Sequence, residues 1–591
     1  MRILLLCHSF NSLSQRLYSE LAARGHQLSV EFDIADSVAE EAVALFRPEL
    51  IVAPYLRRAI PASIWEQHCC LIVHPGIVGD RGPSALDWAI QEGEQAWGVT
   101  VLQATGELDG GPIWASENFP MRVARKSSLY RHEVTEAASC AVLRAVERFA
   151  SGSFVPVPVD AADASARIRG CARPLLRQSD RAIDWQHDDS ATILARLNAA
   201  DGFPGVADRL FGEPCRLFDA WPEDRLRGGA PGEVIAWRET AILRATVDGA
   251  LWIGHVRREE EANAAARADA RSEANVRTFK LPATQVFATQ LASIPEAPLA
   301  GETRYFAAVG RTWQDIRYEE AGSVGFLHFD FYNGAMSTRQ CQRLLAAWQW
   351  AQQRPVSIIV LMGGRDFWSN GIHLHSIEAA ESPADESWAN INAIDDLAEA
   401  IIRNETQLTI AALQGNCGAG GCFLARAADL VWARTGVLLN PHYRNMGNLY
   451  GSEYWTYLLP ARVGVEGAQA MMRNRLPMSP AVGLAAGLVD ACLAGDLDAF
   501  RVDVARRAAE LAAAPDLAAR LQEKGAQRHA DEALKPLASY RAAELAELQR
   551  NFYGFDPSYH VARYHFVHKT PASWTPRHLA IHRDLGWSLP Q

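Results

Sequence analysis

The first 120 residues alternate short apolar runs with helix-like stretches. Apolar runs stand at residues 3–6, 28–32, 50–53 and 70–73, and turn or helix signals bound each of them. This rhythm is typical of βαβ units in a doubly wound parallel sheet. The loop after the first run, residues 7–12, has no glycine. Since a dinucleotide needs glycines there to bring its pyrophosphate against the backbone, we expect no NAD or FAD site in this region.

The pattern changes between about residues 150 and 290, where prolines are frequent. Short alternating runs at 241–247 and 250–253 predict antiparallel strands of a small β-barrel or sandwich.

A further α/β domain is predicted from about residue 304. Its strand candidates are 324–329, 357–362 and 409–412, and glycine-rich turns follow the last two. Residues 496–551 are rich in Ala, Leu, Glu and Arg, so they are expected to be helical. The predicted organisation is a multidomain α/β protein with four regions, 1–165, 166–290, 304–495 and 496–591.

Composition narrows the functional classes. The 591 residues are 49% hydrophobic and 21% charged, which is ordinary for a globular protein with several cores. The net charge of −11 disfavours general nucleic-acid binding, which needs a basic face. The 10 cysteines form no Cys-x-x-Cys, so reduced thiols and a cytoplasmic location are expected. No apolar run approaches the length of a membrane span, and the start is interpreted as a strand, not a signal peptide.

Two residues of the first region form a candidate catalytic pair. His74 ends a buried strand before a Gly/Pro-rich loop, and Asp109 lies in a turn after the next strand. Sites in open α/β sheets form at the carboxyl ends of strands, and a His–Asp pair there can transfer protons. Alternatively, His74 simply ends the strand and Asp109 makes an Asx-turn.

Both segments resemble the folate-dependent formyltransferases, which include methionyl-tRNA formyltransferase and formyltetrahydrofolate deformylase. The matching motifs are His-Pro-Gly from His74, Arg-Gly-Pro from Arg81, Gly-Val-Thr from Gly98 and Leu-Asp-Gly-Gly-Pro-Ile from Leu108, with further matches at 173–185 and 231–235. The resemblance implies a Rossmann-like formyltransferase domain and a small OB-like β-barrel. It also implies 10-formyltetrahydrofolate as the formyl donor and catalytic roles for His74 and Asp109.

One position departs from the formyltransferase pattern. The family has Asn-x-His, in which the Asn donates a hydrogen bond to the oxyanion, but this chain has Ile72 there. Losing one oxyanion donor typically lowers a rate by about 10²–10³-fold. Gln15 and Arg131 are candidate replacements and candidate cofactor-binding residues, with an ordinary surface position as the alternative for each.

Two glycine-rich turns follow strands in the second half of the chain. Residues 360–374 run from a strand into one turn, and residues 414–423 run from a strand into a glycine-rich helix start. Two such turns can direct two backbone N–H groups at one carbonyl oxygen. Alternatively, the glycines only permit close helix–sheet packing.

These turns resemble the crotonase (enoyl-CoA hydratase/isomerase) superfamily, which binds acyl-CoA thioesters. The resemblance implies a crotonase-like α/β domain followed by C-terminal helices, coenzyme A as a ligand, and oxyanion N–H groups at Ile372 and Gly420. Phe423 replaces the first catalytic glutamate of the superfamily, and the second falls at about His442. Hydration by the usual pair of carboxylates is therefore not expected.

Polar and aromatic residues stand where the superfamily places its second catalytic group. Among them, Tyr443 and Glu453 are candidate proton-transfer groups, because burial of a glutamate near a tyrosine can raise its pKa. Each could instead make a structural hydrogen bond. His373 and His375 could suggest a metal, but no third ligand follows at a usual spacing, so no metal site is expected.

Both kinds of segment occur together in the HypX (HoxX) family of hydrogenase maturation factors, which this chain resembles over nearly its whole length. The resemblance implies that the formyl carbon of 10-formyltetrahydrofolate becomes the CO ligand of NiFe hydrogenase, through formyl transfer to coenzyme A and decarbonylation of formyl-CoA. Arg131, Arg473 and Lys569 are candidate contacts of the CoA phosphates. The implied partners are folate, CoA and possible hydrogenase maturation proteins or the hydrogenase large subunit.

Three alternatives stay open from the sequence. The chain could formylate an amine and carry a non-catalytic CoA-binding module, it could be a deformylase that releases formate, or it could be a scaffold that binds CoA. Because a free formyl thioester would be exposed to hydrolysis, the two-site route predicts a cavity that connects the sites.

Overall fold

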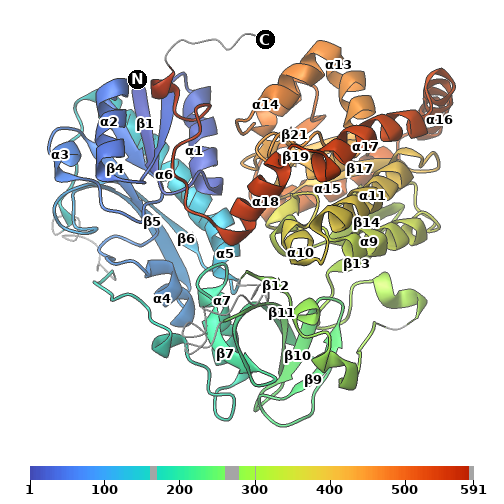
Figure 1. The fold of residues 1–591 in the computed structure, drawn as a ribbon, viewed down its shortest axis with the longest axis horizontal. Coiled ribbons are helices and arrows are strands. Elements are labelled where there is room, and N and C mark those ends of the chain that lie inside the picture. Colours follow the sequence, from blue (N-terminus) through green and yellow to red (C-terminus); the bar gives the residue numbers. More distant parts are fainter. Residues whose placement is uncertain (160–169, 260–278, 300, 585–591) are drawn as a thin grey trace. The chain divides into compact units, whose positions relative to one another are not determined.

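The computed structural model describes residues 1–159, 170–259, 279–299 and 301–584 (Figure 1). Contacts divide the chain into two compact units. The first contains the described parts of 1–276, 282–295 and 571–591, and the second contains those of 277–281 and 296–570. The short strand β12 (Leu281–Pro282) lies where the chain passes from one unit to the other.

The first unit begins with a six-stranded sheet in the order β2-β1-β3-β4-β5-β6. Its strands are β1 (Arg2–Cys7), β2 (Gln27–Phe32), β3 (Leu50–Ala53), β4 (Cys70–His74), β5 (Ala96–Gln103) and β6 (Ile113–Pro120). The helices around it are α1 (Ser12–Ala23), α2 (Asp36–Phe46), α3 (Ala62–Trp65), α4 (Ala85–Gln91), α5 (Lys126–Leu129), the π-helical turn η1 (Tyr130–Val134) and α6 (Thr135–Ser151). Figure 1 shows α1 and α6 on one side of this sheet and α2 on the other, which explains why β1 is buried from Ile3 onward.

The sheet is mixed, whereas the apolar rhythm predicted a parallel one. Strands β1 to β4 are parallel, but β5 pairs antiparallel with both β4 and β6. The reason lies in the connection between β4 and β5. Its helix α4 packs on α7 (Ser190–Ala200) instead of crossing over the sheet, so the chain re-enters the sheet in the opposite direction.

An antiparallel sheet in the order β7-β8-β11-β10-β9 completes the first unit. Its strands are β7 (Val206–Leu210), β8 (Glu213–Glu223), β9 (Val234–Arg238), β10 (Ala241–Ala245) and β11 (Ala250–Arg258), with α8 (Ala283–Val286) packed on β11. Helix α7 lies against β8 and contributes to one shared apolar core. The alternating runs at 241–247 and 250–253 therefore form neighbouring antiparallel strands, as the sequence predicts.

The second unit is built on two sheets. A six-stranded sheet has the order β13-β14-β15-β17-β19-β21, and a smaller parallel sheet has the order β16-β18-β20. The larger sheet contains β13 (Ile316–Ala321), β14 (Val324–Phe329), β15 (Ile358–Leu361), β17 (Leu408–Leu413), β19 (Leu430–Arg434) and β21 (Ala491–Leu493). The smaller one contains β16 (Phe367–Ser369), β18 (Asn416–Gly418) and β20 (Leu439–Asn440). Each short strand of the smaller sheet follows a strand of the larger one, so the glycine-rich turns lie between the two sheets.

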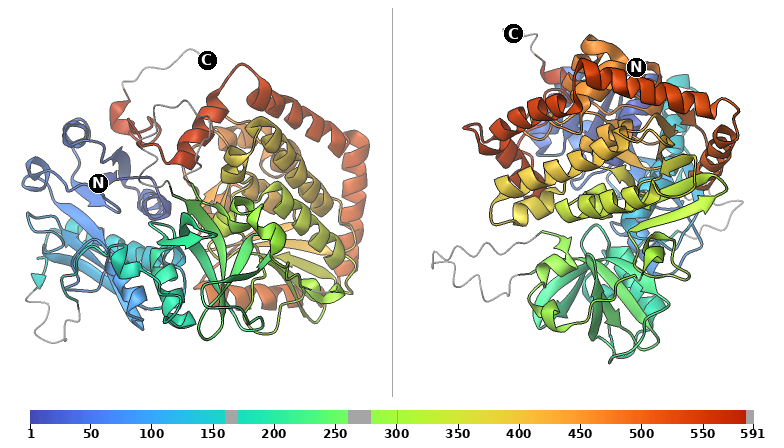
Figure 2. Two further views of the ribbon diagram at one scale, coloured as in Figure 1. Left: turned by 60° about the horizontal axis from the view of Figure 1, so that its bottom comes forward. Right: turned by 90° about the vertical axis from the view of Figure 1, so that its right-hand side faces the viewer.

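Helices cover both faces of the larger sheet. The helices described in this unit are α9 (Thr338–Ala351), α10 (Leu374–Ala379), α11 (Pro383–Ile402), α12 (Gly420–Arg426), α13 (Trp455–Arg473), α14 (Pro480–Ala485), α15 (Leu497–Ala512), α16 (Leu517–Leu534), α17 (Leu537–Tyr553) and α18 (Ser558–His568). Figure 2 shows α9 and α11 running side by side, and their contacts confirm it. Ile359 and Leu361 of β15 face the core that α9 and α11 share, while Ile358 and Val360 face α15 on the other side.

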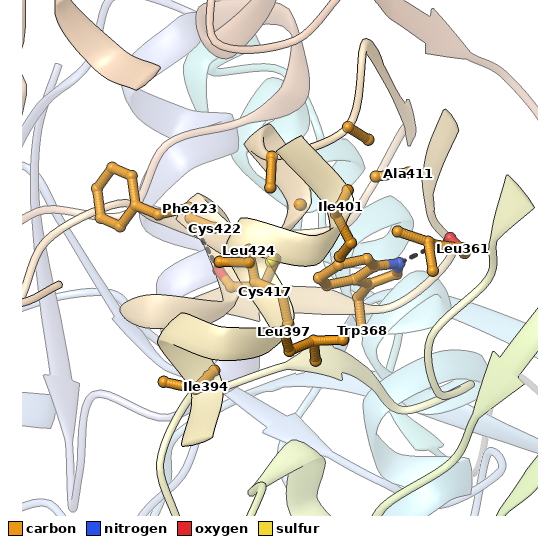
Figure 3. Packing of buried hydrophobic residues seen from close by; sticks show 14 of the residues in the cluster. Leu361, Trp368, Ile394, Leu397, Ile401, Ala411, Cys417, Cys422, Phe423 and Leu424 are labelled. Atoms are coloured by element: carbon orange, nitrogen blue, oxygen red, sulfur yellow. Dashed lines mark hydrogen bonds between the residues drawn. The ribbon is translucent and has the colours of Figure 1, made fainter. Parts of the chain in front are cut away.

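A dense apolar cluster supports the glycine-rich turns (Figure 3). The Trp368 indole N–H donates to the Leu361 carbonyl at 3.1 Å, which ties β16 to β15. The Cys422 thiol donates to the Cys417 carbonyl at 3.2 Å, which ties the start of α12 to β18. This packed core therefore holds both glycine-rich turns in place.

The predicted C-terminal helical region extends from α15 to α18 within the second unit. The residues that follow differ: the described residues 571–584 belong to the first unit. Within the described parts of the chain, no helix has the length and apolar character needed to cross a bilayer.

Candidate active sites

The His74 site is formed where β4 ends. The His74 Nε2 lies 2.8 Å from Asp80 Oδ1, and its Nδ1 lies 3.5 Å from Asp109 Oδ2. Asp109 Oδ2 also accepts a hydrogen bond from the Gly82 backbone N–H at 3.1 Å. The structure thus brings His74 and Asp109 together, as the sequence predicts, and adds a second carboxylate on the opposite side of the imidazole.

Local structure fixes this arrangement. Thr100 pairs with His74 across β4 and β5, and its hydroxyl donates to the Gly76 carbonyl at 2.9 Å. A Cβ at residue 76 would overlap the His74 ring and Asp80, so only glycine permits the close packing. Asp109 has a left-handed backbone (φ 51°), a conformation that aspartate tolerates better than most residues.

Asp80 is the site residue that the sequence reasoning missed. Its carboxylate is buried, and Oδ2 lies 4.0 Å from the Arg173 Nε. A buried carboxylate against one imidazole nitrogen stabilises an imidazolium and fixes the ring orientation. The sequence signal for Asp80 is an acidic residue six positions after His74, in the loop that follows the strand.

The candidate replacements for the missing asparagine both belong to the first unit but differ in their surroundings. Ile72, on the strand that carries His74, packs in the apolar cluster beneath α2 and offers no donor. Gln15, in the first turn of α1, donates its side-chain amide to the Phe10 carbonyl at 2.8 Å. Arg131 lies in η1, next to Tyr130, whose hydroxyl is hydrogen-bonded to Asn11 at the start of α1. The roles of Gln15 and Arg131 stay predictions.

The two glycine-rich turns meet in the second unit. Gly371 has φ 75°, and a Cβ on it would lie 3.2 Å from the Gly420 nitrogen. Ile372 follows that glycine, and its bridge to Met336 fixes its backbone. The backbone of Ala419, just before Gly420, is also left-handed (φ 46°). The N–H groups of Ile372 and Gly420 therefore belong to segments that are in contact.

The Tyr443–Glu453 pair lies beside Gly420. The Tyr443 hydroxyl donates to Glu453 Oε2, and a Cβ at residue 420 would overlap the Glu453 carboxyl. Phe423, at the position of the absent hydratase glutamate, stacks on the Tyr443 ring with centroids 5.4 Å apart. The structure thus brings Gly420, Tyr443 and Glu453 together and uses Phe423 to cover the tyrosine.

Burial dominates the electrostatics of this pair. It raises the pKa of Glu453 to about 8, and the nearby Asp395 adds to the effect. Burial also raises the pKa of Tyr443, and the charge of Glu453 acts in the same direction. A carboxyl with a pKa close to neutrality can both accept and release a proton at working pH.

Two predicted CoA-binding cations are placed at helix ends. Arg473 ends α13 and donates to the Gln469 carbonyl at 3.2 Å. Lys569 caps α18 with a left-handed backbone, and its Nζ lies 4.2 Å from the centre of the Phe566 ring. Among the described residues, no hydrogen bond or ion pair joins either cation to the Tyr443–Glu453 pair, and their roles stay predictions.

The two histidines considered for a metal have another use. The His373 Nδ1 accepts the Ser376 backbone N–H at 3.0 Å and so caps α10. His375 lies edge-on to His373, with ring centres 6.1 Å apart. Within the described ranges, no three metal-ligating side chains are grouped.

Comparisons with known proteins agree with this division of sites. Residues 24–146 match the formyl transferase family, 175–273 match the formyl transferase C-terminal domain, and 327–577 match the enoyl-CoA hydratase/isomerase family. A hydrogenase maturation factor HoxX from Bradyrhizobium diazoefficiens is 53% identical over 583 residues, which cover 99% of this chain and 97% of that protein. The chain belongs to the HypX/HoxX family of hydrogenase maturation factors.

Structural similarity confirms the membership and the predicted fold class. The crystal structure of HypX from Aquifex aeolicus in complex with tetrahydrofolic acid is 46% identical and has a TM-score of 0.93, with 100% of both chains covered. A methionyl-tRNA formyltransferase from Trichlorobacter lovleyi is 26% identical over 216 residues, 36% of this chain and 66% of that protein. This member of the HypX/HoxX family thus combines a Rossmann-like formyltransferase domain with a crotonase-like domain.

Proposed function

We propose that this HypX/HoxX family member converts the formyl group of 10-formyltetrahydrofolate into carbon monoxide for the NiFe hydrogenase site. The observation that carries the proposal is the buried Tyr443–Glu453 pair beside the Gly420 backbone. This pair would transfer protons at a turn that would polarise a thioester, where the hydratase glutamate is absent. The tetrahydrofolate bound to the Aquifex aeolicus HypX supports folate as the formyl carrier.

In the first unit, His74 would take the proton of the attacking CoA thiol. The thiolate then bonds to the formyl carbon, and the C–N bond to the folate breaks as the His74 imidazolium passes its proton to the folate nitrogen. The imidazolium that forms lies between the carboxylates of Asp80 and Asp109, which stabilise it electrostatically. Ile72 supplies no oxyanion donor, so the rate of this step depends on these charges and on the candidates Gln15 and Arg131.

In the second unit, the N–H groups of Ile372 and Gly420 would bind the oxygen of the formyl thioester. A formyl thioester has no α-carbon, so enolate chemistry is impossible. The Tyr443–Glu453 pair would instead take the formyl proton, and the electrons of the C–H bond become the carbon lone pair of CO. The C–S bond breaks, and the pair returns the proton to the thiolate.

The residues present fit coenzyme A at the thioester end. Glycine at 371 and 420 keeps the two turns in contact, and the N–H groups of Ile372 and Gly420 would bind the carbonyl oxygen. We further propose Arg131, Arg473 and Lys569 as phosphate contacts, a cytoplasmic location, and hydrogenase maturation proteins or the large subunit as CO acceptors.

A gas assay tests the proposal. The full chain is incubated with 10-formyltetrahydrofolate labelled with ¹³C in the formyl group, with and without CoA, and CO is trapped on deoxyhaemoglobin. We expect labelled CO that depends on CoA and is lost in Tyr443→Phe. Labelled formate without CO would indicate a deformylase, and a labelled formyl-amine would indicate an amine formyltransferase; either result contradicts the proposal.

A further inference from the structure

The turn that carries Glu453 has an unusual backbone. Glu453 and Tyr454 are both left-handed, with φ 59° and 60°, and Tyr454 is the N-cap of α13. Residues other than glycine rarely adopt this backbone conformation, and two such residues in succession require support from outside the turn. That support comes from two buried carboxyls on other helices.

The first carboxyl is Asp395 on α11. Its Oδ1 accepts the Glu453 backbone N–H at 2.9 Å, and both of its oxygens lie 2.7 Å from the Ser452 hydroxyl. Asp395 thus binds both Glu453 and the preceding residue, Ser452. The Nε of Arg541, on α17, lies 3.9 Å from Asp395 Oδ2.

The second carboxyl is Glu544 on α17. It accepts the backbone N–H of Tyr454 at 3.0 Å and that of Thr456 at 2.8 Å, and also the Thr456 hydroxyl. These are the donors that the first turn of α13 leaves without helical partners. Glu544 Oε2 also lies 3.2 Å from the Ser452 hydroxyl, so Ser452 bridges the two carboxyls.

This support leaves Tyr443 with two acceptors. Its hydroxyl reaches Glu453 Oε2 and, at 3.1 Å, the carbonyl of Ser452. When Glu453 is ionised, it accepts the tyrosine hydrogen. When Glu453 is protonated, it can donate to the tyrosine oxygen while Tyr443 donates to Ser452. Both protonation states are therefore satisfied as long as the Ser452 carbonyl is held in place.

We propose that Asp395 and Glu544 are positioning residues, which hold the Ser452–Thr456 turn and, through their charge, set the proton affinity of Glu453 for proton transfer with Tyr443. This inference rests on the proposed decarbonylation at that pair. Neither residue touches the reacting atoms, and neither belongs to a motif that the sequence singles out.

The electrostatic surroundings support this role. Burial raises the pKa of Asp395 to about 6 and that of Glu544 to about 8, and the charge of Asp395 is the next cause for Glu544 and for Glu453. The titratable and charged groups around the turn are Cys341 on α9, Asp395, Asp396 and Glu399 on α11, Arg403 at the end of α11, Arg541 and Glu544 on α17, and Tyr443 and Tyr454 beside the turn. The four carboxyls in this set outnumber Arg403 and Arg541, so the surroundings favour the protonated form of Glu453.

The experiment follows CO release from supplied formyl-CoA as a function of pH. Glu453 acts as a base when ionised, so kcat of the wild-type chain should rise through about pH 8. Asp395→Asn removes a negative charge near Glu453, so the rising limb of the kcat–pH profile should move to lower pH by about one unit or more. Glu544→Gln should move it in the same direction, and Ser452→Ala should lower kcat with little change in KM.

Glu547→Gln is the matched control, because Glu547 lies on the same helix as Glu544 but pairs with Arg550 in solvent. Its pH profile should coincide with that of the wild type. A limb that stays in place in both Asp395→Asn and Glu544→Gln, even with reduced thermal stability, would assign these residues a purely structural role and overturn the proposal.

An infrared titration separates this inference from the proposed function. The carboxylic-acid band that is absent in Glu453→Gln is followed with pH in the full chain without substrate. A band that titrates at lower pH in Asp395→Asn supports the positioning role even if no CO forms from formyl-CoA. An unshifted band overturns it whatever the gas assay shows.

Discussion

The central candidate residue of each unit, His74 in the first and Glu453 in the second, is buried. His74 lies between two carboxylates in a closed strand end, and Glu453 is buried beside a tyrosine that phenylalanine covers. Carboxylates beside an imidazole fix its orientation, whereas carboxyls buried together favour the neutral form of one of them. The same residue type therefore serves different purposes in the two units.

At the residue scale, Asp80 gives a direct test of the His74 site. In Asp80→Asn, the amide no longer stabilises an imidazolium, so formyl transfer should fall by about 10²–10⁴-fold. The rate is measured as tetrahydrofolate release from 10-formyltetrahydrofolate and CoA. CO release from supplied formyl-CoA should be unchanged, since that step is assigned to the other unit.

The control for this variant is Glu107→Gln. Glu107 is an exposed residue that pairs with Arg81 near the same loop, so its loss should leave tetrahydrofolate release almost unchanged. Equal losses in both variants would show that the loop, and not the Asp80 charge, limits the reaction.

At the element scale, the C-terminal segment 571–584 completes the edge of the first sheet. The Val30 backbone N–H of β2 donates to the Leu579 carbonyl at 3.0 Å, and that of Phe32 donates to the Thr575 hydroxyl at 2.8 Å. The buried Glu31 accepts from Thr575 and lies 2.9 Å from His582 Nε2. The segment thus covers the outer backbone groups of an edge strand, which would otherwise be open to another chain.

Glu31→Gln should loosen this segment. The glutamine amide keeps one acceptor oxygen, so the buried donors that face the other position lose their acceptor, which costs about 1–3 kcal/mol. Faster hydrogen exchange and proteolysis within 571–584 would report it. Glu41→Gln is the control, because Glu41 contacts Arg583 from an exposed position and its loss should have a much smaller effect.

The pH dependence of the segment has a definite sign. Burial would raise the pKa of Glu31, but hydrogen bonds from His582, Thr575 and Arg583 outweigh it and lower that pKa. The stabilisation that ionised Glu31 gives to the segment is therefore complete above the ordinary glutamate pKa of about 4.3. It is lost as pH falls below that value. Protection of 571–584 that stayed constant down to pH 3 in the wild type would contradict this assignment.

At the scale of the whole molecule, the proposed route needs both units in one chain. Formyl-CoA is hydrolytically labile, so we expect it to pass to the second site without release. A mixture of His74→Asn and Tyr443→Phe chains, each inactive in a different step, should then make far less labelled CO than the wild type. Rates restored by simple mixing would show that formyl-CoA diffuses freely through solution, contrary to the expected connecting cavity.

The sequence by itself determined the local features of this protein. Apolar runs located the strands, and glycines with fixed neighbours located the turns at Gly371 and Gly420, because a close backbone approach excludes a Cβ. Motif similarity located His74, Asp109, Tyr443 and Glu453, since catalytic groups follow strand ends at recognisable spacings. The structure shows each of these two pairs in contact, while their catalytic roles stay predictions.

Tertiary structure alone decided what surrounds those residues. The reversed direction of β5 depends on where α4 packs, and Asp80 reaches His74 through a loop whose course its residues do not specify. Asp395 and Glu544 lie on ordinary helices, and the segment 571–584 pairs with a strand more than 540 residues away. Such long-range contacts leave no periodic or local pattern in the sequence, because they form only when distant segments pack together in the folded chain.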